Sequence, residues 1–500
     1  MNTKLSYLPL LLAFLGCSGN HNQNLENPNI VIVLTDDLGY GDVSELNPES
    51  KIQTPNIDAL AGEGVWFTDA HAAASVCSPS RYALLTGRYA WRGKLKSGIV
   101  LPYDEPVIEK GRVCLPQMLK EKGYNTVCIG KWHLGFLWPW KDGIMPPAQD
   151  RHTGLKNDMF DWSKPIGGGP LAIGFDHYFG DGVPNFPPYA FIEDSFLTCN
   201  PVDIDPSKFE FIGPTGYFHG AGPGQEGWRL ENVMPSLTQK AVWYIENNCK
   251  KKEPFFLYFA TTSPHTPVVP LPKFQGKSKD GYRGDYVVQT DDAIGQVIRA
   301  LKENNCFDNT LLIVTSDNGP DTYTIEEIRK YNHFAAGPYR GVKFDTWEGG
   351  HREVFVASWP AGGIVGGKKN NSLISLTDVF ATIAGIVGYE LPENCAEDGY
   401  DILPSLKSLK PIRKEMVYQN AKGNLGLRQD NWVYLEGSGG NKKPDWYNKI
   451  FDIQSPDSTI QLFNLSKDPG QKINIEENYA EKVRKMADRL TEIKKNGKSR

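Results

Sequence analysis

The sequence has no excess of basic residues. Its 500 residues include 54 Lys and Arg against 59 Asp and Glu, and the formal net charge is −5. A nucleic-acid-binding protein is expected to show a basic surplus, so the charge balance argues against nucleic acid as a partner. If the substrate is an anion, the positive charge that binds it must be local to the site. A chain of this length exceeds the usual single core, which predicts one large α/β domain and a smaller one.

The N-terminal apolar run is too short to cross a bilayer. Residues 8–15 are apolar, follow Lys4 and are followed by Gly16-Cys17 and a polar stretch. This pattern predicts an export signal over residues 1–17, with 18–26 as a tether. It is similar to a bacterial lipoprotein signal, which implies a lipid anchor at Cys17 and a periplasmic or outer-membrane lipoprotein location in a bacterium. Because Phe14 stands where such signals prefer leucine, an unlipidated secretory peptide is the alternative.

The cysteines show no CxxC pair and no spacing typical of metal ligands. Apart from Cys17 and Cys77, they are Cys114, Cys128, Cys199, Cys249, Cys306 and Cys395. Disulfides are compatible with an exported protein, but the sequence does not give a pairing. We expect most of these six residues to be buried thiols.

Residues 77–88 read CSPSRYALLTGR and predict a helix with Cys77 at its start. Pro79 suits the first helical turn, and Gly87 is a typical end signal after the apolar pair Leu84-Leu85. Backbone N–H groups and the helix dipole favour an anion at such an N-terminus. A cysteine that stood there alone would more often be a buried structural residue.

The whole string matches every specified position of C-x-P-S-R-x-x-L-L-T-G-R, and it resembles the signature of the type I sulfatases, the formylglycine-dependent members of the alkaline phosphatase superfamily. The resemblance runs from about residue 27 to about residue 474. It implies that a formylglycine-generating maturation enzyme oxidises Cys77 to Cα-formylglycine, whose hydrated aldehyde is the nucleophile. It also implies an α/β fold with an alkaline-phosphatase-like, mixed, mostly parallel sheet flanked by helices over residues 27–405. A smaller C-terminal antiparallel sheet with a helix is expected over 406–500.

Two predicted buried strands, 29–34 and 310–314, are each followed by oxygen-rich side chains. Ligands gather beyond the C-terminal ends of strands in open α/β sheets, and adjacent carboxylates repel each other unless a cation neutralises them. A polar turn is the alternative for the first pair. An all-oxygen set suits Ca²⁺, or less well Mg²⁺. The resemblance implies that the ligands of this cation are Asp36, Asp37, Asp317, Asn318 and residue Cys77.

Three further strings resemble sulfatase signatures: 130–135 reads GKWHLG, 263–267 reads SPHTP and 340–352 reads RGVKFDTWEGGHR. The resemblance implies that Lys131 and Lys343 bind sulfate. It implies that His133 acts on the formylglycine hydroxyl and that His265 donates a proton to the leaving oxygen. Three carboxylates, a divalent cation, Arg81 and the two lysines together carry a charge of about +2, so a bound sulfate ester and an ionised formylglycine hydroxyl would bring the site near neutrality.

The substrate is expected to be a sulfated glycan. Residues 136–235 are rich in aromatics, Pro and Gly, and long loops of this kind are typically binding loops. Aromatic faces beside polar groups suit sugar rings. His177 and His219 are therefore candidate substrate contacts, although packing or surface positions account for each histidine equally well. Asp345 and Arg352 are further candidates. The loop layout is similar to that of bacterial exo-sulfatases acting on galactose or N-acetylgalactosamine 6-O- or 4-O-sulfates.

Two other functions are compatible with parts of the sequence. Phosphomonoester or phosphonate hydrolysis is the nearest, because relatives in the superfamily share the metal site. A non-catalytic glycan-binding protein would result if Cys77 were not matured. The complete string at Cys77 and the full set of catalytic residues favour sulfate ester hydrolysis.

Overall fold

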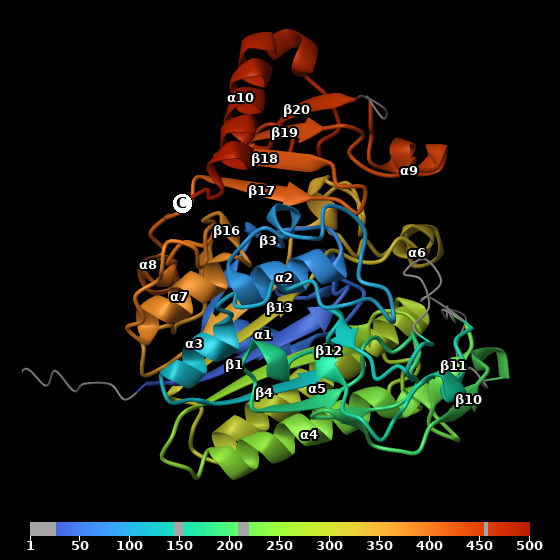
Figure 1. Ribbon diagram of the computed structural model, residues 1–500. Helices are drawn as coiled ribbons and strands as arrows, with labels where there is room; N and C mark the ends of the chain where they lie inside the picture. The colour runs from blue at the N-terminus through green and yellow to red at the C-terminus, as the bar shows by residue number, and fades with distance from the viewer. Residues whose placement is uncertain (1–26, 145–153, 209–219, 455–458) are drawn as a thin grey trace, which may run out of the picture.

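The computed structural model describes residues 27–144, 154–208, 220–454 and 459–500 (Figure 1). The expected export signal with Cys17, the tether 18–26 and His219 lie outside the described residues. Among the helices of the described part of the chain, none is both long and apolar enough to cross a membrane.

A ten-stranded sheet forms the centre of the molecule, in the order β15-β2-β14-β13-β1-β12-β4-β7-β8-β9. The five central strands from β13 to β7 run parallel, whereas β14, β8 and β9 pair in the antiparallel sense. This confirms the expected mixed, mostly parallel sheet. The strands are β1 (Asn29–Asp36), β2 (Val65–Phe67), β4 (Asn125–Gly130), β7 (His177–Gly180), β8 (Ile192–Glu193), β9 (Phe196–Leu197), β12 (Phe255–Pro264), β13 (Thr310–Ser316), β14 (Phe355–Ser358) and β15 (Lys368–Asn370).

Strand β1 shows why the central strands are continuous apolar runs. Ile30, Ile32 and Leu34 belong to the hydrophobic core on one face of the sheet, and Val31 and Val33 belong to the core on the other. A strand that is covered on both faces needs apolar side chains at successive positions, so it does not alternate between apolar and polar residues.

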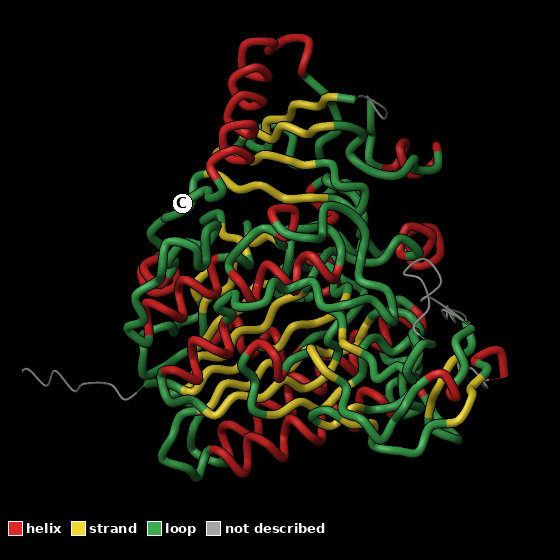
Figure 2. The backbone as a smooth tube through the Cα atoms, in the orientation of Figure 1, coloured by secondary structure: helices red, strands yellow, loops and turns green. Residues whose placement is uncertain are grey.

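Helices cover both faces of the sheet (Figures 1 and 2). On one face lie α1 (Pro55–Glu63), α4 (Val233–Asn248) and α5 (Gly281–Glu303). On the other lie α2 (Cys77–Thr86), α3 (Leu115–Glu121) and α7 (Asp378–Ile386). The remaining described α-helices are α6 (Thr324–Tyr331), α8 (Leu403–Ser408), α9 (Asp445–Ile450) and α10 (Ala480–Asn496).

The C-terminal part forms a second, antiparallel sheet. Its strands in order are β17 (Glu415–Gln419), β18 (Leu425–Gln429), β19 (Trp432–Glu436) and β20 (Ile460–Asn464). Apolar residues of α10 pack on this sheet in a cluster that also contains Ala83 of α2. The small antiparallel sheet with its closing helix is thus confirmed, and it supports the helix that carries Cys77. The division of the chain at 405/406 stays a prediction.

Residues 136–235, for which the sequence predicts long loops, contain two two-stranded sheets among the described residues. Here β5 (Phe136–Leu137) pairs with β6 (Gly167–Gly168), and β10 (Val202–Ile204) pairs with β11 (Gly222–Gly224). Strands β7, β8 and β9 of the same region extend the main sheet. Elsewhere β3 (Ala70–His71) pairs with β16 (Ile374–Ser375). These strands are too short to show a clear period in the sequence.

One disulfide joins the ends of two helices on the same face. Cys249 directly follows α4 and Cys306 lies just beyond α5, with their Cα atoms 5.8 Å apart, a normal span for a disulfide. Cys114, Cys128 and Cys395 are buried thiols and Cys199 is half-buried, so three of the six cysteines, and not most of them, are buried thiols.

Candidate active site

The predicted site residues follow the C-terminal ends of four neighbouring parallel strands. Asp37 follows β1, Asp317 follows β13, Lys131 follows β4 and His265 follows β12. Because these strands are adjacent and parallel, their ends meet at one edge of the sheet. The N-terminus of α2 brings Cys77 to the same edge, where its Sγ lies 3.8 Å from Asp36 Oδ1.

Cys77 is the first residue of α2, as the sequence predicts, and Gly87 ends the helix with a φ of 64°. The side chain of Cys77 is buried. Burial raises the pKa of the Cys77 thiol to about 12, although the charges of Lys131 and Lys343 lower it. The unmodified thiol therefore stays protonated at neutral pH, and a protonated thiol is a poor nucleophile.

Gly130 allows the close approach that places Lys131. A Cβ atom at this position would lie 1.8 Å from the carbonyl oxygen of Ala260 on β12, and the backbone has a φ of 107°. Only glycine adopts this conformation at little cost. The first glycine of the GKWHLG string therefore has a structural role, because it allows the chain to turn at the end of β4 and enter the site.

Three buried carboxylates each face a buried cation. The pairs are Asp36 Oδ2 with Lys131 Nζ at 2.8 Å, Asp37 Oδ2 with Lys343 Nζ at 2.8 Å and Asp317 Oδ2 with Arg81 Nη2 at 2.7 Å. All six side chains are at most 4% exposed. Such pairs must form in the interior, because one unpaired charge there would be strongly destabilising.

The three carboxylates differ in their electrostatics. Burial raises the pKa of Asp36, but the charges of Lys131, Arg81 and Lys343 outweigh burial and lower this pKa well below its usual value. Burial and the charge of Asp36 raise the pKa of Asp37 to about 7 and that of Asp317 to about 6, against the attraction of their own cations. Burial is the largest cause of both rises, and a further positive charge beside these carboxylates would favour their ionised forms.

The oxygen atoms at this edge fit a hard divalent cation. Asn318 donates through Nδ2 to Asp37 Oδ1 at 2.6 Å, while its own Oδ1 is buried with no hydrogen-bond partner among the described residues. One ligand atom each from Asp36, Asp37, Cys77 and His265 lies within 4.8 Å of the others. Crowded carboxylates and an orphaned amide oxygen are the donors that Ca²⁺ prefers, and a cation there would relieve the carboxylate repulsion.

The two histidines of the predicted set are neutral. His133 donates from Nε2 to the carbonyl oxygen of Val100 at 3.0 Å, and its Nδ1 is buried without a hydrogen-bond partner in the described structure. Burial and the charge of Lys131 lower the pKa of His133 well below its usual value. Burial and the charge of Lys343 lower the pKa of His265 to about 4, and its Nε2 lies 3.7 Å from Asp37 Oδ2.

A cavity of about 310 Å³ opens onto Cys77, and His133, His265 and Lys343 line it. Its wall also contains residues that the sequence analysis did not single out, among them Asn185, Phe186, Asp321 and Phe344. The Oδ1 atom of Asn185 is buried without a hydrogen-bond partner among the described residues, and Asp321 Oδ2 lies 4.0 Å from Lys343 Nζ. Asp321 follows the TSDNG string closely, whereas no sequence pattern marks Asn185.

Among the described residues predicted as substrate contacts, His177, Asp345 and Arg352 do not line this cavity. Asp345 is buried against Lys443 Nζ at 2.6 Å, and Arg352 pairs with Glu348 and Asp69. His177 lies on β7, with its side chain 67% exposed, beside a separate groove on the α4 face of the sheet. The functional roles of these residues stay predictions.

The fold and the site together indicate an enzyme of α/β fold, with buried charged side chains and a cavity at the carboxyl edge of its parallel strands. The sulfatase family profile matches residues 28–389, and the chain belongs to the sulfatase family, which confirms the resemblance. It is therefore a sulfuric ester hydrolase.

Several relatives are similar over most of the chain. An N-acetylgalactosamine-6-O-sulfatase of Bacteroides thetaiotaomicron is 34% identical, with 98% of each chain covered. The human N-acetylgalactosamine-6-sulfatase is 32% identical over 78% of this chain and 68% of that protein. A solved structure from a study of glycosaminoglycan metabolism by Bacteroides thetaiotaomicron has a TM-score of 0.79 and 32% identity, covering 94% of this chain and 99% of that one.

Proposed function

We propose that this sulfatase removes sulfate from glycans, with galactose or N-acetylgalactosamine 6-O- or 4-O-sulfates as its substrates and 6-O favoured. The observation that carries the proposal is the position of Cys77, at a helix N-terminus, 3.8 Å from the acidic cluster and open to a cavity with two histidines and a lysine. Relatives named N-acetylgalactosamine-6-sulfatases from a bacterium and a mammal support the 6-O position.

The unmodified side chains supply neither the nucleophile nor the cation that we propose. Oxidation of Cys77 to formylglycine by a maturation enzyme would supply a hydrated aldehyde, whose hydroxyl is a nucleophile that the protonated thiol is not. A divalent cation, Ca²⁺ rather than Mg²⁺, would polarise the oxygen atoms around it and favour their negative charge. Its proposed ligands are Asp36, Asp37, Asp317, Asn318 and residue Cys77.

The chain's own cations prepare the site for an anion. Lys343 lies on the cavity wall, and we assign it the binding of the sulfate group. Lys131 and Arg81 are fully buried behind it and hold Asp36 and Asp317. Charges fixed in a dry site before the substrate arrives need no reorganisation during the reaction, which is how electrostatic stabilisation lowers a barrier.

The histidines divide the proton transfers between them. The Nδ1 atom of His133 is unprotonated, because its Nε2 donates to the Val100 carbonyl oxygen, so it is placed to accept a proton from the hydroxyl of residue 77. His265 must instead carry a proton on Nε2 to protonate the leaving oxygen. An anionic sulfate in the cavity would raise the pKa of His265, so we propose that His265 becomes protonated when the substrate binds. The Lys343 ammonium group is the second proton donor in this proposal.

The test combines chemistry at residue 77 with a substrate screen. Mass spectrometry of the peptide that contains residue 77 should show the aldehyde, and Cys77→Ala should abolish release of sulfate while the unfolding temperature is retained. Defined galactose and N-acetylgalactosamine sulfates should release sulfate faster than an aryl phosphate releases phosphate. Full activity with an intact thiol at residue 77 would refute the proposed nucleophile, and a preference for phosphate would refute the substrate class.

Export of the protein is part of the same proposal. The Cys249–Cys306 disulfide supports it, because disulfides persist mainly in oxidising compartments. We propose a periplasmic or outer-membrane location in a bacterium, with a lipid at Cys17. Metabolic labelling with a fatty acid, compared between the natural chain and Cys17→Ala, tests the anchor.

A further inference from the structure

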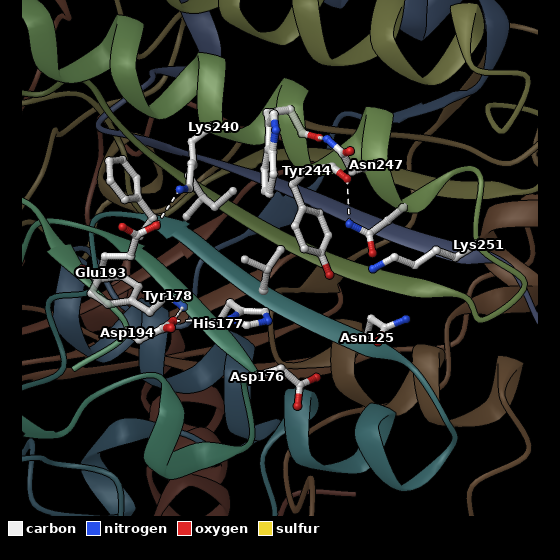
Figure 3. A pocket seen from close by; sticks show the side chains of 15 residues that line it. Asn125, Asp176, His177, Tyr178, Glu193, Asp194, Lys240, Tyr244, Asn247 and Lys251 are labelled. Atoms are coloured by element: carbon white, nitrogen blue, oxygen red, sulfur yellow. Dashed lines mark hydrogen bonds and ion pairs between the residues drawn. The ribbon is translucent and has the colours of Figure 1, made fainter. Parts of the chain in front are cut away.

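A second hollow lies on the α4 face of the sheet, away from Cys77. We call it the α4–β7 groove. It is a cavity of about 380 Å³ between α4, β4, β7 and β8 (Figure 3). It shares no lining residue with the Cys77 cavity. Strand β4 connects the two, because Asn125, Val127 and Ile129 line the groove and Lys131 follows the strand, roughly 7 to 20 Å farther on at about 3.3 Å per residue.

The groove combines an apolar floor with an exposed aromatic ring. Val127 and Ile129 of β4 and Phe179 of β7 contribute apolar surface. Trp243 of α4 is 55% exposed, which is unusual for so large an apolar side chain. The ammonium group of Lys240 lies 5.4 Å from the Trp243 ring centroid and 4.8 Å from that of Phe179, so the rings and the cation form one wall.

Two buried polar atoms in the groove have no partner. The hydroxyl of Tyr244 and the Oδ1 atom of Asn248 are without hydrogen bonds in the described structure, although these residues are only 6% and 4% exposed. Figure 3 shows the Tyr244 hydroxyl directed toward the space bordered by His177, Asp176 and Asn125. A buried polar group without a partner is destabilising, so a donor or an acceptor from a ligand, or water, is expected beside them.

The charges of the groove indicate an uncharged ligand. Three carboxylates and two ammonium groups line it, so the lining is not a cationic one. Two of the carboxylates already have cations: Glu193 Oε1 lies 2.6 Å from Lys240 Nζ, and Asp176 Oδ1 lies 2.6 Å from Lys120 Nζ. A sulfate group would find no surplus of positive charge here and would meet carboxylates, in contrast to the Cys77 cavity with its lysine.

We propose that the α4–β7 groove is a binding site for an uncharged saccharide, distinct from the catalytic cavity. An exposed indole provides a flat apolar face for a sugar ring. Carboxylates, amides and the Tyr244 hydroxyl around it provide the alternating donors and acceptors that hydroxyl groups need. The occupant is an unsulfated sugar unit, which would hold a glycan chain on the enzyme while another part of the chain reaches Cys77. The choice of a sugar as the ligand rests on the proposed glycan substrate as well as on the residues that line the groove. Sugar binding is measured without turnover. The groove proposal can therefore be refuted while the proposed sulfatase activity is retained.

In the experiment, the full-length protein is titrated with unsulfated disaccharides of galactose and of N-acetylgalactosamine. Binding is measured by calorimetry or saturation-transfer NMR. Saturable binding at millimolar concentration is expected, and Trp243→Ala should weaken it about tenfold, as loss of one aromatic contact of about 1.4 kcal/mol predicts. Trp446→Ala is the matched control, because Trp446 is a half-buried surface tryptophan on α9, in the C-terminal part of the chain (Figure 1).

The two variants distinguish sugar bound in the groove from sugar bound elsewhere on the protein. The product sugar can also occupy the Cys77 cavity, but such binding would not respond to Trp243→Ala. Equal binding by Trp243→Ala and the natural protein therefore overturns the proposal. So does equal weakening by Trp446→Ala, or the absence of saturable binding, which would leave the groove as a water-filled crevice. Unfolding temperatures of both variants are measured to exclude a loss of fold.

Discussion

The Cys77 cavity and the α4–β7 groove use the same strand for opposite purposes. Strand β4 lines the groove along its length and delivers Lys131 to the catalytic edge. At that edge Asp36, Asp37 and Asp317 each have a cation within 2.8 Å, whereas the groove holds a hydroxyl and an amide oxygen with no partner among the described residues. The first site is built for one charged group and one reaction. The second has the mixed lining that suits a neutral molecule bound by contact alone.

Removal of the proposed divalent cation should have the largest effect, and only at the catalytic edge. A chelator is expected to abolish sulfate release, because the carboxylates of Asp36, Asp37 and Asp317 then face one another without the cation. Activity should return with Ca²⁺, measured on an aryl sulfate. Sugar binding to the groove should persist in the chelated protein. Its loss would show that the two sites are not independent, and unchanged turnover would exclude a catalytic cation.

The stability of the chelated protein, relative to the Ca²⁺-loaded protein, should decrease as the pH rises. The pKa values of Asp37 and Asp317 rise from 3.8 to about 7 and about 6 in the folded, cation-free protein. A carboxyl group with a raised folded-state pKa loses stabilisation as the pH increases from its unfolded value through its folded value. The chelated protein should therefore lose unfolding temperature relative to the Ca²⁺-loaded protein between about pH 4 and pH 7. Histidines far from the site contribute equally to both forms and cancel in the difference.

Loss of the Lys343 ammonium group from the wall of the Cys77 cavity should lower turnover nearly as strongly as removal of the metal ion. Lys343→Met removes the ammonium group from the cavity and leaves Asp37 without its partner, so kcat/KM should fall by roughly 100- to 1000-fold. Lys443→Met is a matched control, because Lys443 is also a buried lysine paired with an aspartate, Asp345, but does not line the cavity. It should lower the unfolding temperature with little change in turnover. An equal loss of turnover in both variants would trace the effect to general destabilisation, or to a substrate contact of Asp345.

The sequence predicts the catalytic edge far better than the groove, for a physical reason. Apolar runs such as 29–34 show that a strand is buried on both faces, and parallel neighbours then bring their C-terminal ends together. The residues around Cys77 also occur in contiguous strings. The groove instead arises from the register of β4 with β7, which sets Val127 opposite His177, and from the packing of α4 over both. No string of adjacent residues encodes that arrangement.

His177 and the disulfide illustrate the same limit. The aromatic and glycine neighbours of His177 predict a substrate loop, but His177 lies on strand β7, between β4 and β8, and lines the groove. Cys249 and Cys306 are separated by 57 residues, and their pairing depends on how α4 packs beside α5. Side-chain partners across elements follow from tertiary packing, which local patterns do not determine.

The smallest and sharpest test of the comparison changes a single oxygen atom. Tyr244→Phe removes the unpartnered hydroxyl from the groove and keeps the ring that packs against Phe255. If that hydroxyl bonds to a sugar, disaccharide binding should weaken a few-fold, by about 1 kcal/mol for one hydrogen bond, while the free protein is equally or more stable because no unsatisfied group remains. Tyr103→Phe removes another buried hydroxyl that lacks a partner among the described residues, outside the groove, and should leave binding unchanged. Unaltered binding in Tyr244→Phe would show that the hydroxyl is simply hydrated, and the groove would then lose the feature that most separates it from an ordinary surface crevice.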